Sequence, residues 1–175
     1  MELAQSIVQN AYVVQDIDQA IQRWHRLWGL GPFLVRRHMA MAEVRYRGQL
    51  SQLDISAAFA QAGPIQVELL QQHCQTPSAF RDMFAGQGEG LHHVAVQVTD
   101  PEALLDRYRS CGLARASELR TAGGRGAVLV DTRPLVGHMT EVYLSPDATR
   151  AFYQQVAQAA AAWDGREIII ELEPS

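Results

Sequence analysis

The sequence lacks lysine, has only two cysteines and contains no long apolar run. Without clustered Lys and Arg, and with a formal net charge of -4, nucleic acid is not expected as a partner. No segment approaches the roughly 20 apolar residues that span a bilayer, so no membrane partner is expected either. Cys74 and Cys111 fit no metal-binding spacing, and we expect two buried, reduced thiols in a cytoplasmic protein.

What is present is the composition of a globular protein. Hydrophobic residues make up 47% of the chain and charged residues 19%, a balance that excludes a disordered chain. A length of 175 residues suits one compact domain, or two small modules that share a core.

The chain contains an internal repeat with a constant offset of 84 residues. The segment QNAYVVQDIDQAIQRW begins at Gln9, and HVAVQVTDPEALLDRY begins at His93. Each has a polar residue, an apolar strand, an aspartate that suits a helix N-cap, and a helical segment. The equivalent positions are Gln9 with His93, Asp16 with Asp100, Ala20 with Leu104, and Trp24 with Tyr108.

Strand-like segments follow each predicted helix. Gly29 and Gly112 are expected to end the two helices. Alternation and turn signals then predict strands at residues 33–38, 42–47, 53–61 and 65–71, and at residues 116–120, 126–131 and 140–144. Each half is therefore a βαβββ unit, which cannot bury both faces of its sheet alone, so the two halves must pair in an α+β fold.

Four regions follow from this pattern: a first module at residues 1–75, a linker at 76–90, a second module at 91–145 and a tail at 146–175. A short helix is expected in the linker at residues 77–84. The tail is expected to form a helix from residue 146 to about residue 163, then a short strand at 166–172.

The repeat resembles the vicinal-oxygen-chelate superfamily over roughly residues 5–145, and is most similar to glyoxalase I and methylmalonyl-CoA epimerase-like members. The resemblance implies a curved, cup-like mixed sheet with helices outside. It also implies metal ligands on the first and last strand of each module. In this sequence those positions are Gln9, Glu68, His93 and Glu141.

The residue types at these positions support the implied site. Glu68 lies in the apolar run IQVELLQ and Glu141 in MTEVYL, and a carboxylate within such a strand is costly unless it is paired or coordinated. Gln9 shares a strand face with apolar Ala11 and Val13. This oxygen-rich set suits one divalent ion, Zn²⁺, Ni²⁺, Co²⁺, Mn²⁺ or Mg²⁺, in an open geometry.

The remaining histidines are expected to have ordinary structural roles. Strand alternation places the side chain of His92 on the face opposite His93, so it is not expected to be a ligand. The others lie on a predicted helix, in loops or at strand ends, where satisfied or solvated side chains are usual: His25, His38, His73 and His138.

The ligand order Gln, Glu, His, Glu is that of one branch of glyoxalase I. The resemblance therefore implies a metal-dependent lyase, isomerase or epimerase, in which the metal stabilises an enolate next to a carbonyl or thioester. Glu141 would be the mobile catalytic base, and Glu68 the second catalytic carboxylate. Arg45 and Arg47 share a predicted strand face and suit an anionic small-molecule substrate, although a solvated outer sheet face explains them slightly better.

Two other functions remain open within the same fold. One is a non-catalytic small-molecule or drug-binding resistance protein. The other is an Fe²⁺-dependent extradiol dioxygenase, which needs two His and one carboxylate, whereas this chain lacks the first His. The sequence does not identify the substrate or the metal, nor whether glutathione or CoA is involved.

The resemblance also implies a homodimer, with metal sites built either within chains or across the interface. A helical stripe in the tail offers apolar side chains for such a contact, namely Phe152, Tyr153, Val156 and Trp163. The alternative is that this stripe packs on its own sheet.

Overall fold

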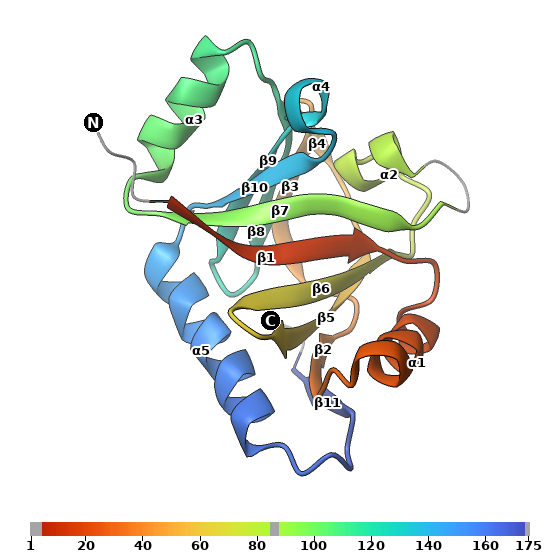
Figure 1. The fold of residues 1–175 in the computed structure, drawn as a ribbon. Helices are drawn as coiled ribbons and strands as arrows, with labels where there is room; N and C mark the ends of the chain where they lie inside the picture. Colours follow the sequence, from red (N-terminus) through yellow and green to blue (C-terminus); the bar gives the residue numbers. More distant parts are fainter. Residues whose placement is uncertain (1–4, 85–87, 174–175) are drawn as a thin grey trace.

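The computed structural model describes residues 5–84 and 88–173, so the chain ends and part of the predicted linker lie outside the described residues. A single curved sheet runs through the molecule with helices around it (Figure 1). The sheet has eleven strands in the order β11-β2-β5-β6-β1-β7-β10-β9-β8-β3-β4. Among these residues, no helix is long and apolar enough to cross a membrane. The predicted α+β fold is confirmed.

The two halves of the repeat form equivalent parts of this sheet. The first half contributes β1 (Gln5–Val13), α1 (Ile17–Trp28), β2 (Phe33–Arg36), β5 (Ile55–Ala62) and β6 (Ile65–Gln72). The second half contributes β7 (Gly90–Val98), α3 (Pro101–Ser110), β8 (Arg115–Thr121), β9 (Gly126–Val130) and β10 (Met139–Tyr143). β1 and β7 pair antiparallel at the centre, and each is flanked by the last strand of its own half, β6 or β10, in parallel. This arrangement brings all four predicted ligand strands side by side.

The helices of the repeat begin as the sequence predicts. The side chain of Asp16 accepts a hydrogen bond from the Gln19 amide, and that of Asp100 accepts one from the Ala103 amide. Each aspartate thereby satisfies one of the free N–H groups in the first helical turn. α1 ends at Gly29, whose φ of 65° is the left-handed conformation that glycine adopts most readily.

A hairpin inserted in the first half joins the sheet of the second. β3 (Met41–Tyr46) pairs with β8, and β4 (Gln49–Ser51) pairs with β3. Arg47 and Gly48 both have positive φ, as a tight two-residue hairpin turn requires. The strand at residues 42–47 was predicted, but β4 was not, because a three-residue strand carries too little alternation to be recognised.

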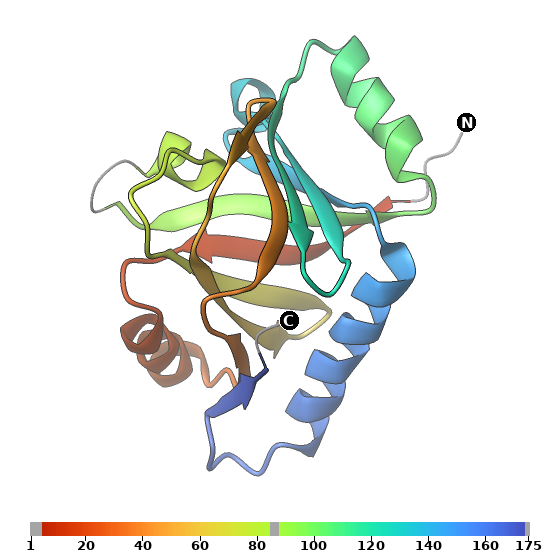
Figure 2. The same cartoon turned by 180° about the vertical axis from the view of Figure 1, so that it is seen from behind.

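The tail packs on the chain itself. α5 (Pro146–Ala162) runs along one side of the molecule before β11 (Ile169–Leu172), which lies parallel to β2 (Figure 2). The two other helices, α2 (Ala79–Met83) and α4 (Arg133–Val136), are short. Phe152 and Val156 are only 9% and 1% exposed and pack in one cluster with Phe59. Of the two alternatives for this stripe, Phe152 and Val156 therefore follow the second, packing on the chain's own sheet.

The cysteines also differ from expectation. Both are free, as predicted, but neither is buried: Cys111 is exposed and Cys74 is partly exposed. Cys111 is the C-cap residue of α3.

Candidate functional site

The concave side of the sheet encloses a cavity of about 110 Å³. Strands from both halves form its floor, and α5 contributes to its wall. The lining is mostly apolar, with a cluster of polar side chains at the floor. The lining also includes the polar and aromatic residues Gln9, Gln66, Glu68, His93, Arg125, Glu141, Tyr143 and Tyr153.

Three of the predicted ligands meet at this floor. Nε2 of His93 lies 3.7 Å from an oxygen of Glu68 and 3.6 Å from an oxygen of Glu141. The sheet order explains the meeting: Glu141 pairs with Ala95 on β7, and Glu68 with Ala11 on β1, so the two carboxylates approach His93 from either side. Gln9 lines the same cavity. All four side chains belong to one chain.

The first strand of each half, β1 or β7, has a shift in its pairing register close to its predicted ligand, Gln9 or His93. On β1 the shift lies between Ile7 and Gln9, and on β7 the pairing skips His92. A β-bulge of this kind turns a side chain away from strict alternation, and bulges are common next to active sites. Both halves of the repeat therefore share this irregularity in strand pairing as well as the strands themselves.

The bulge at His92 corrects the expectation that this side chain points away from His93. Nδ1 of His92 lies 2.9 Å from Nδ1 of His93, and Nε2 of His92 lies 3.0 Å from the carbonyl oxygen of Ala79. A carbonyl only accepts, so Nε2 of His92 must donate to it. Burial, and then the charge of His93, lower the pKa of His92 to about 3, so His92 is neutral and its Nδ1 accepts.

This chain of hydrogen bonds fixes the tautomer of neutral His93. Because His92 Nδ1 accepts, His93 Nδ1 must donate, and the Nε2 lone pair of a neutral His93 faces the two carboxylates. Nε2 is buried and makes no hydrogen bond within the described residues. An imidazole nitrogen aimed at two carboxylates, with its other nitrogen held by a hydrogen bond, is the arrangement of a metal ligand with an orienting partner.

A second polar chain surrounds Gln9. Its amide nitrogen donates to Gln66 over 2.7 Å, and its oxygen accepts from the Tyr143 hydroxyl over 3.2 Å. The Tyr143 hydroxyl also lies 3.0 Å from that of Tyr153 on α5. Burial and the nearby Glu141 raise the pKa of Tyr143 well above its usual value, so the hydroxyl keeps its proton. The Gln9 amide is therefore held in one orientation.

The buried charges at the floor shift each other's pKa. The pKa of Glu68 is raised to about 7, because burial outweighs the opposing charge of His93 and the charge of Glu141 adds to the increase. Burial opposes a charge on His93, but contact with Glu141 and the negative charges of Glu141 and Glu68 outweigh it and raise the pKa of His93. Without a cation, the cluster therefore holds protons near neutral pH.

A divalent ion fits these donors on chemical grounds. Glu68, His93 and Glu141 each offer one ligand atom, and these atoms lie within 4.8 Å of one another. The partnerless Nε2 of His93 needs either a proton or a cation between it and the carboxylates. An amide oxygen from Gln9 would make the set oxygen-rich, as suits an open Zn²⁺, Ni²⁺, Co²⁺, Mn²⁺ or Mg²⁺ site.

The two arginines predicted to contact substrate lie elsewhere. Neither Arg45 nor Arg47 lines the cavity. Arg45 contacts Glu43 over 2.7 Å, and Arg47 contacts Asp82 over 2.7 Å, with both side chains more than 40% exposed. A role for them in substrate binding stays a prediction.

Arg125 lies in the cavity wall instead. Its guanidinium stands over the Phe152 ring at 5.2 Å and makes no ion pair with any described residue. Burial lowers the pKa of Arg125, an effect that Tyr143 partly offsets, so an anion beside the guanidinium would stabilise its charge.

Some of these side chains had a signal in the sequence. Gln66 and Tyr143 each lie two residues from a predicted ligand, so strand alternation alone places them on its face. His92 had none, because its orientation depends on the bulge. Arg125 sits in a predicted loop, whose path over the cup the sequence does not specify.

Comparisons with known proteins agree with this geometry. A profile of the Glyoxalase/Bleomycin resistance protein/Dioxygenase superfamily matches residues 8–128. No curated protein matches the sequence. Methylmalonyl-CoA epimerase from Mycobacterium tuberculosis is similar in structure, with a TM-score of 0.53 at 18% identity over 78% of this chain and 85% of that one.

Two further solved structures have the same fold. A variant of the Streptomyces coelicolor methylmalonyl-CoA epimerase, in complex with 2-nitronate-propionyl-CoA, has a TM-score of 0.55 at 18% identity, over 81% of this chain and 97% of that one. A hypothetical protein from Bacillus halodurans has a TM-score of 0.56 at 17% identity, over 80% and 94% of the two chains. Identities this low establish the shared fold alone.

Proposed function

Because this chain belongs to the Glyoxalase/Bleomycin resistance protein/Dioxygenase superfamily, we propose that it moves a proton on the carbon next to a carbonyl or thioester. The reaction would be that of a metal-dependent epimerase, isomerase or lyase. The observation that carries the proposal is the His93 imidazole, fixed in one tautomer by His92 with its partnerless Nε2 between two buried carboxylates.

Gln9, Glu68, His93 and Glu141 would hold the divalent ion. When bound there, such an ion is a Lewis acid that stabilises negative charge on a substrate oxygen. His92 and Tyr143 would keep the His93 ring and the Gln9 amide in position, because each already makes the hydrogen bond that orients its partner.

Two carboxylates on opposite sides of one site suit transfer of a proton between the two faces of a carbon. Glu141, from the second half of the chain, would remove the proton. Glu68, from the first half, would hold and return one. The raised pKa of Glu68, about 7 before any cation binds, is near the value that favours acid–base exchange at neutral pH. A bound cation would lower that pKa, so the base must detach from it to act.

The lining of the cavity suits a small, partly apolar substrate with an anionic group. Arg125 offers a guanidinium without a carboxylate partner, and Phe59, Phe80 and Phe152 provide apolar wall. An enolisable acyl thioester with a carboxylate meets both requirements. Similar folds are solved with methylmalonyl-CoA and with 2-nitronate-propionyl-CoA, and we extend that class of substrate to this chain.

Solvent deuterium exchange tests the proposal. The protein is incubated in D₂O with branched acyl thioesters, glutathione adducts and hydroxy-ketones, with and without Zn²⁺, Co²⁺ or Ni²⁺. We expect deuterium to enter at least one substrate next to its carbonyl, only when metal is present. Binding of such compounds without exchange would overturn the enzyme proposal and favour the small-molecule-binding alternative.

One observation weighs against the dioxygenase alternative. Among the described residues the cup cluster holds a single histidine, whereas the Fe²⁺ site of an extradiol dioxygenase needs two. Oxygen consumption with a catechol and Fe²⁺ would reverse this conclusion.

We also propose a homodimer in the cytoplasm, on family resemblance. Exposed Leu27 and Trp28, at 77% and 65%, offer an apolar surface at the end of α1 in place of the buried α5 stripe. Light scattering would decide the assembly. Because one chain supplies all four cup ligands, co-expressing Gln9→Ala and His93→Ala chains should not restore a metal site.

A further inference from the structure

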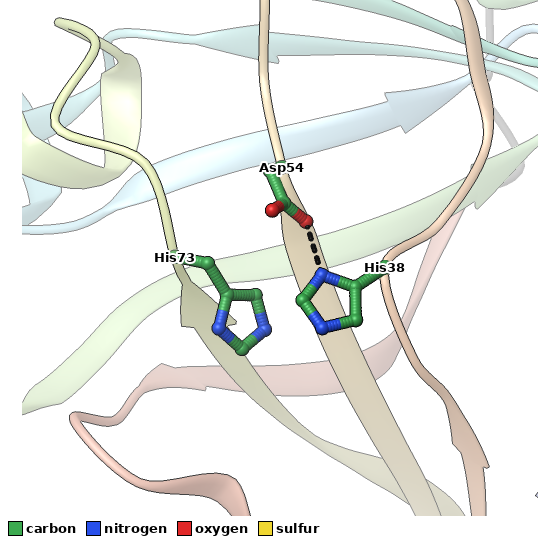
Figure 3. Close-up of side chains that lie close together, drawn as sticks. All are labelled: His38, Asp54 and His73. Carbon is green, nitrogen blue, oxygen red and sulfur yellow. Dashed lines mark hydrogen bonds and ion pairs between the residues drawn. The ribbon is translucent and has the colours of Figure 1, made fainter.

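A second cluster of metal-binding side chains lies outside the cup. His38, Asp54 and His73 meet at one end of strands β2, β5 and β6 (Figure 3). Nδ1 of His38 lies 2.7 Å from an oxygen of Asp54, and the two imidazole rings stack with centroids 4.3 Å apart. One potential ligand atom from each residue lies within 4.8 Å of the others.

Main-chain hydrogen bonds hold the three residues together. The amide of His73 donates to the carbonyl of Asp54 over 2.9 Å, which extends the β5–β6 pairing by one residue. The amide of Met39 donates to the carbonyl of Ile55 over 2.8 Å, and that of His38 to the hydroxyl of Ser56 over 3.1 Å. The cluster is therefore built on strand ends and not on a free loop.

His38 has an uncommon backbone conformation. Its φ of 46° is in the left-handed region, which is unfavourable for a residue other than glycine. The bonds made by its own amide and that of Met39 keep the chain there, and the result is that its imidazole faces Asp54.

The cluster lies on the opposite side of β5 from the cup. Ile55 lines the cavity, and strand alternation turns its neighbours Asp54 and Ser56 to the other face. Ser56 is buried there, and its hydroxyl lies 2.7 Å from Nε2 of His73. The side chains of His38 and Asp54 are 63% and 45% exposed, so an ion and its waters can reach them.

We propose that His38, Asp54 and His73 bind a divalent transition metal, with Zn²⁺, Cu²⁺ and Ni²⁺ as the ions best suited. Two imidazoles and one carboxylate are the donors these ions prefer, and a three-residue set leaves positions for water. The hard ions Mg²⁺ and Ca²⁺ are poorly matched because two of the three donors are nitrogen. Ser56 positions the His73 ring from the buried side.

A metal at this place would tie together the ends of three strands that build one wall of the cup. Met39 and Ile55, which follow His38 and Asp54 in the chain, both line the cavity. The site is independent of the proposed reaction, because it shares no residue with the cup cluster.

Zinc stoichiometry tests the site. Equilibrium dialysis against Zn²⁺ is compared between the wild-type chain, the double variant His38→Ala/His73→Ala, and the matched control His25→Ala, which removes a histidine outside both clusters. We expect the double variant to bind one Zn²⁺ per chain fewer than the other two. Unchanged stoichiometry would overturn the inference.

A second readout does not depend on the alanine variants folding. Substoichiometric Cu²⁺ is added to the wild-type chain, and the imidazole C–H resonances are followed by NMR. We expect those of His38 and His73 to broaden together, before that of His25, and Asp54→Asn to weaken the effect. Broadening that spares His38 and His73 would refute the site.

Failure of this inference is distinguishable from failure of the proposed function. Zinc lost with His93→Ala but not with His38→Ala/His73→Ala leaves the cup site intact and overturns the outer one. The opposite pattern supports the outer site and refutes the metal at the cup.

Discussion

The inside of the cup and the outer face of the same sheet carry clusters of the same residue types in opposite environments. Inside, His93 is 2% exposed between two carboxylates that are about 10% exposed. Outside, His38 and Asp54 are 63% and 45% exposed. The shared chemistry predicts that both can bind metal, and the difference in burial predicts that only the inner cluster has strongly shifted acid–base properties.

Glu141→Gln should have the largest effect on deuterium exchange, because it removes the proposed catalytic base from the cup. At saturating metal we expect deuterium exchange into an accepted substrate to fall by about 10²- to 10⁴-fold. Glu43→Gln is the matched control: it makes the same change at an exposed carboxylate paired with Arg45. Equal loss of exchange in both variants would contradict a special role for the cup carboxylate.

The pH dependence of stability should separate the two clusters in metal-free protein. The folded-state pKa of Glu68 is raised from 4.5 to about 7, and that of His93 is also raised. Folded protein therefore keeps protons that unfolded protein releases, so the free energy of unfolding should fall as pH rises from about 4.5 to about 7. For Glu68 alone the change is on the order of 3 kcal/mol.

At the outer cluster, the expected pH dependence of the free energy of unfolding has the opposite sign. Burial, and then the charge of His38, lower the pKa of His73, so its contribution to stability should be lost as pH falls below 6.5. Its effect should be small because the cluster is solvated. Denaturant unfolding at several pH values, with Glu68→Gln beside the wild type, checks both trends. A metal-free wild type that gains stability between pH 5 and pH 8 would refute the inner trend.

His92→Phe should weaken metal binding at the cup by about 10- to 100-fold, since His92 accepts the hydrogen bond that fixes His93. His25→Phe makes the same change at a histidine outside both clusters and should leave the affinity unaltered. Calorimetric titration with Zn²⁺ in the His38→Ala/His73→Ala background isolates the inner site. Full affinity in His92→Phe would mean that the bulge has no role in orienting the ligand.

The arginines give the smallest expected effect. Arg125→Leu should raise KM for an anionic substrate by about tenfold, as expected for loss of one charged hydrogen bond. Arg45→Leu and Arg47→Leu should leave KM unchanged, because both side chains have acidic partners away from the cavity. A larger KM change in the Arg45 or Arg47 variant would support the sequence-based prediction for these residues.

The sequence specified the inner cluster far better than the outer one. Gln9 and His93 are equivalent positions of a repeat, and Glu68 and Glu141 interrupt apolar strands, so the pattern marks all four. His38, Asp54 and His73 each lie one or two residues beyond the end of a strand, and only the pairing of β2, β5 and β6 brings them together. No local pattern encodes such a meeting, which is why these histidines looked ordinary.

Irregular geometry explains the other misses. The orientation of His92 depends on a register shift, and the β3–β4 hairpin depends on a turn with positive φ at Arg47. Both are exceptions to the alternation from which strands are predicted. The stripe on α5 was identified correctly as apolar, but the sequence does not say whether its own sheet or a partner covers it.

The most direct test of the account counts metal at the cup alone. In a chain whose outer cluster is removed by His38→Ala/His73→Ala, Zn²⁺ content is measured after dialysis, with and without the further change His93→Ala. The account predicts about one ion per chain in the first protein and none in the second. One ion retained after loss of His93, or none in the parent chain, would contradict it.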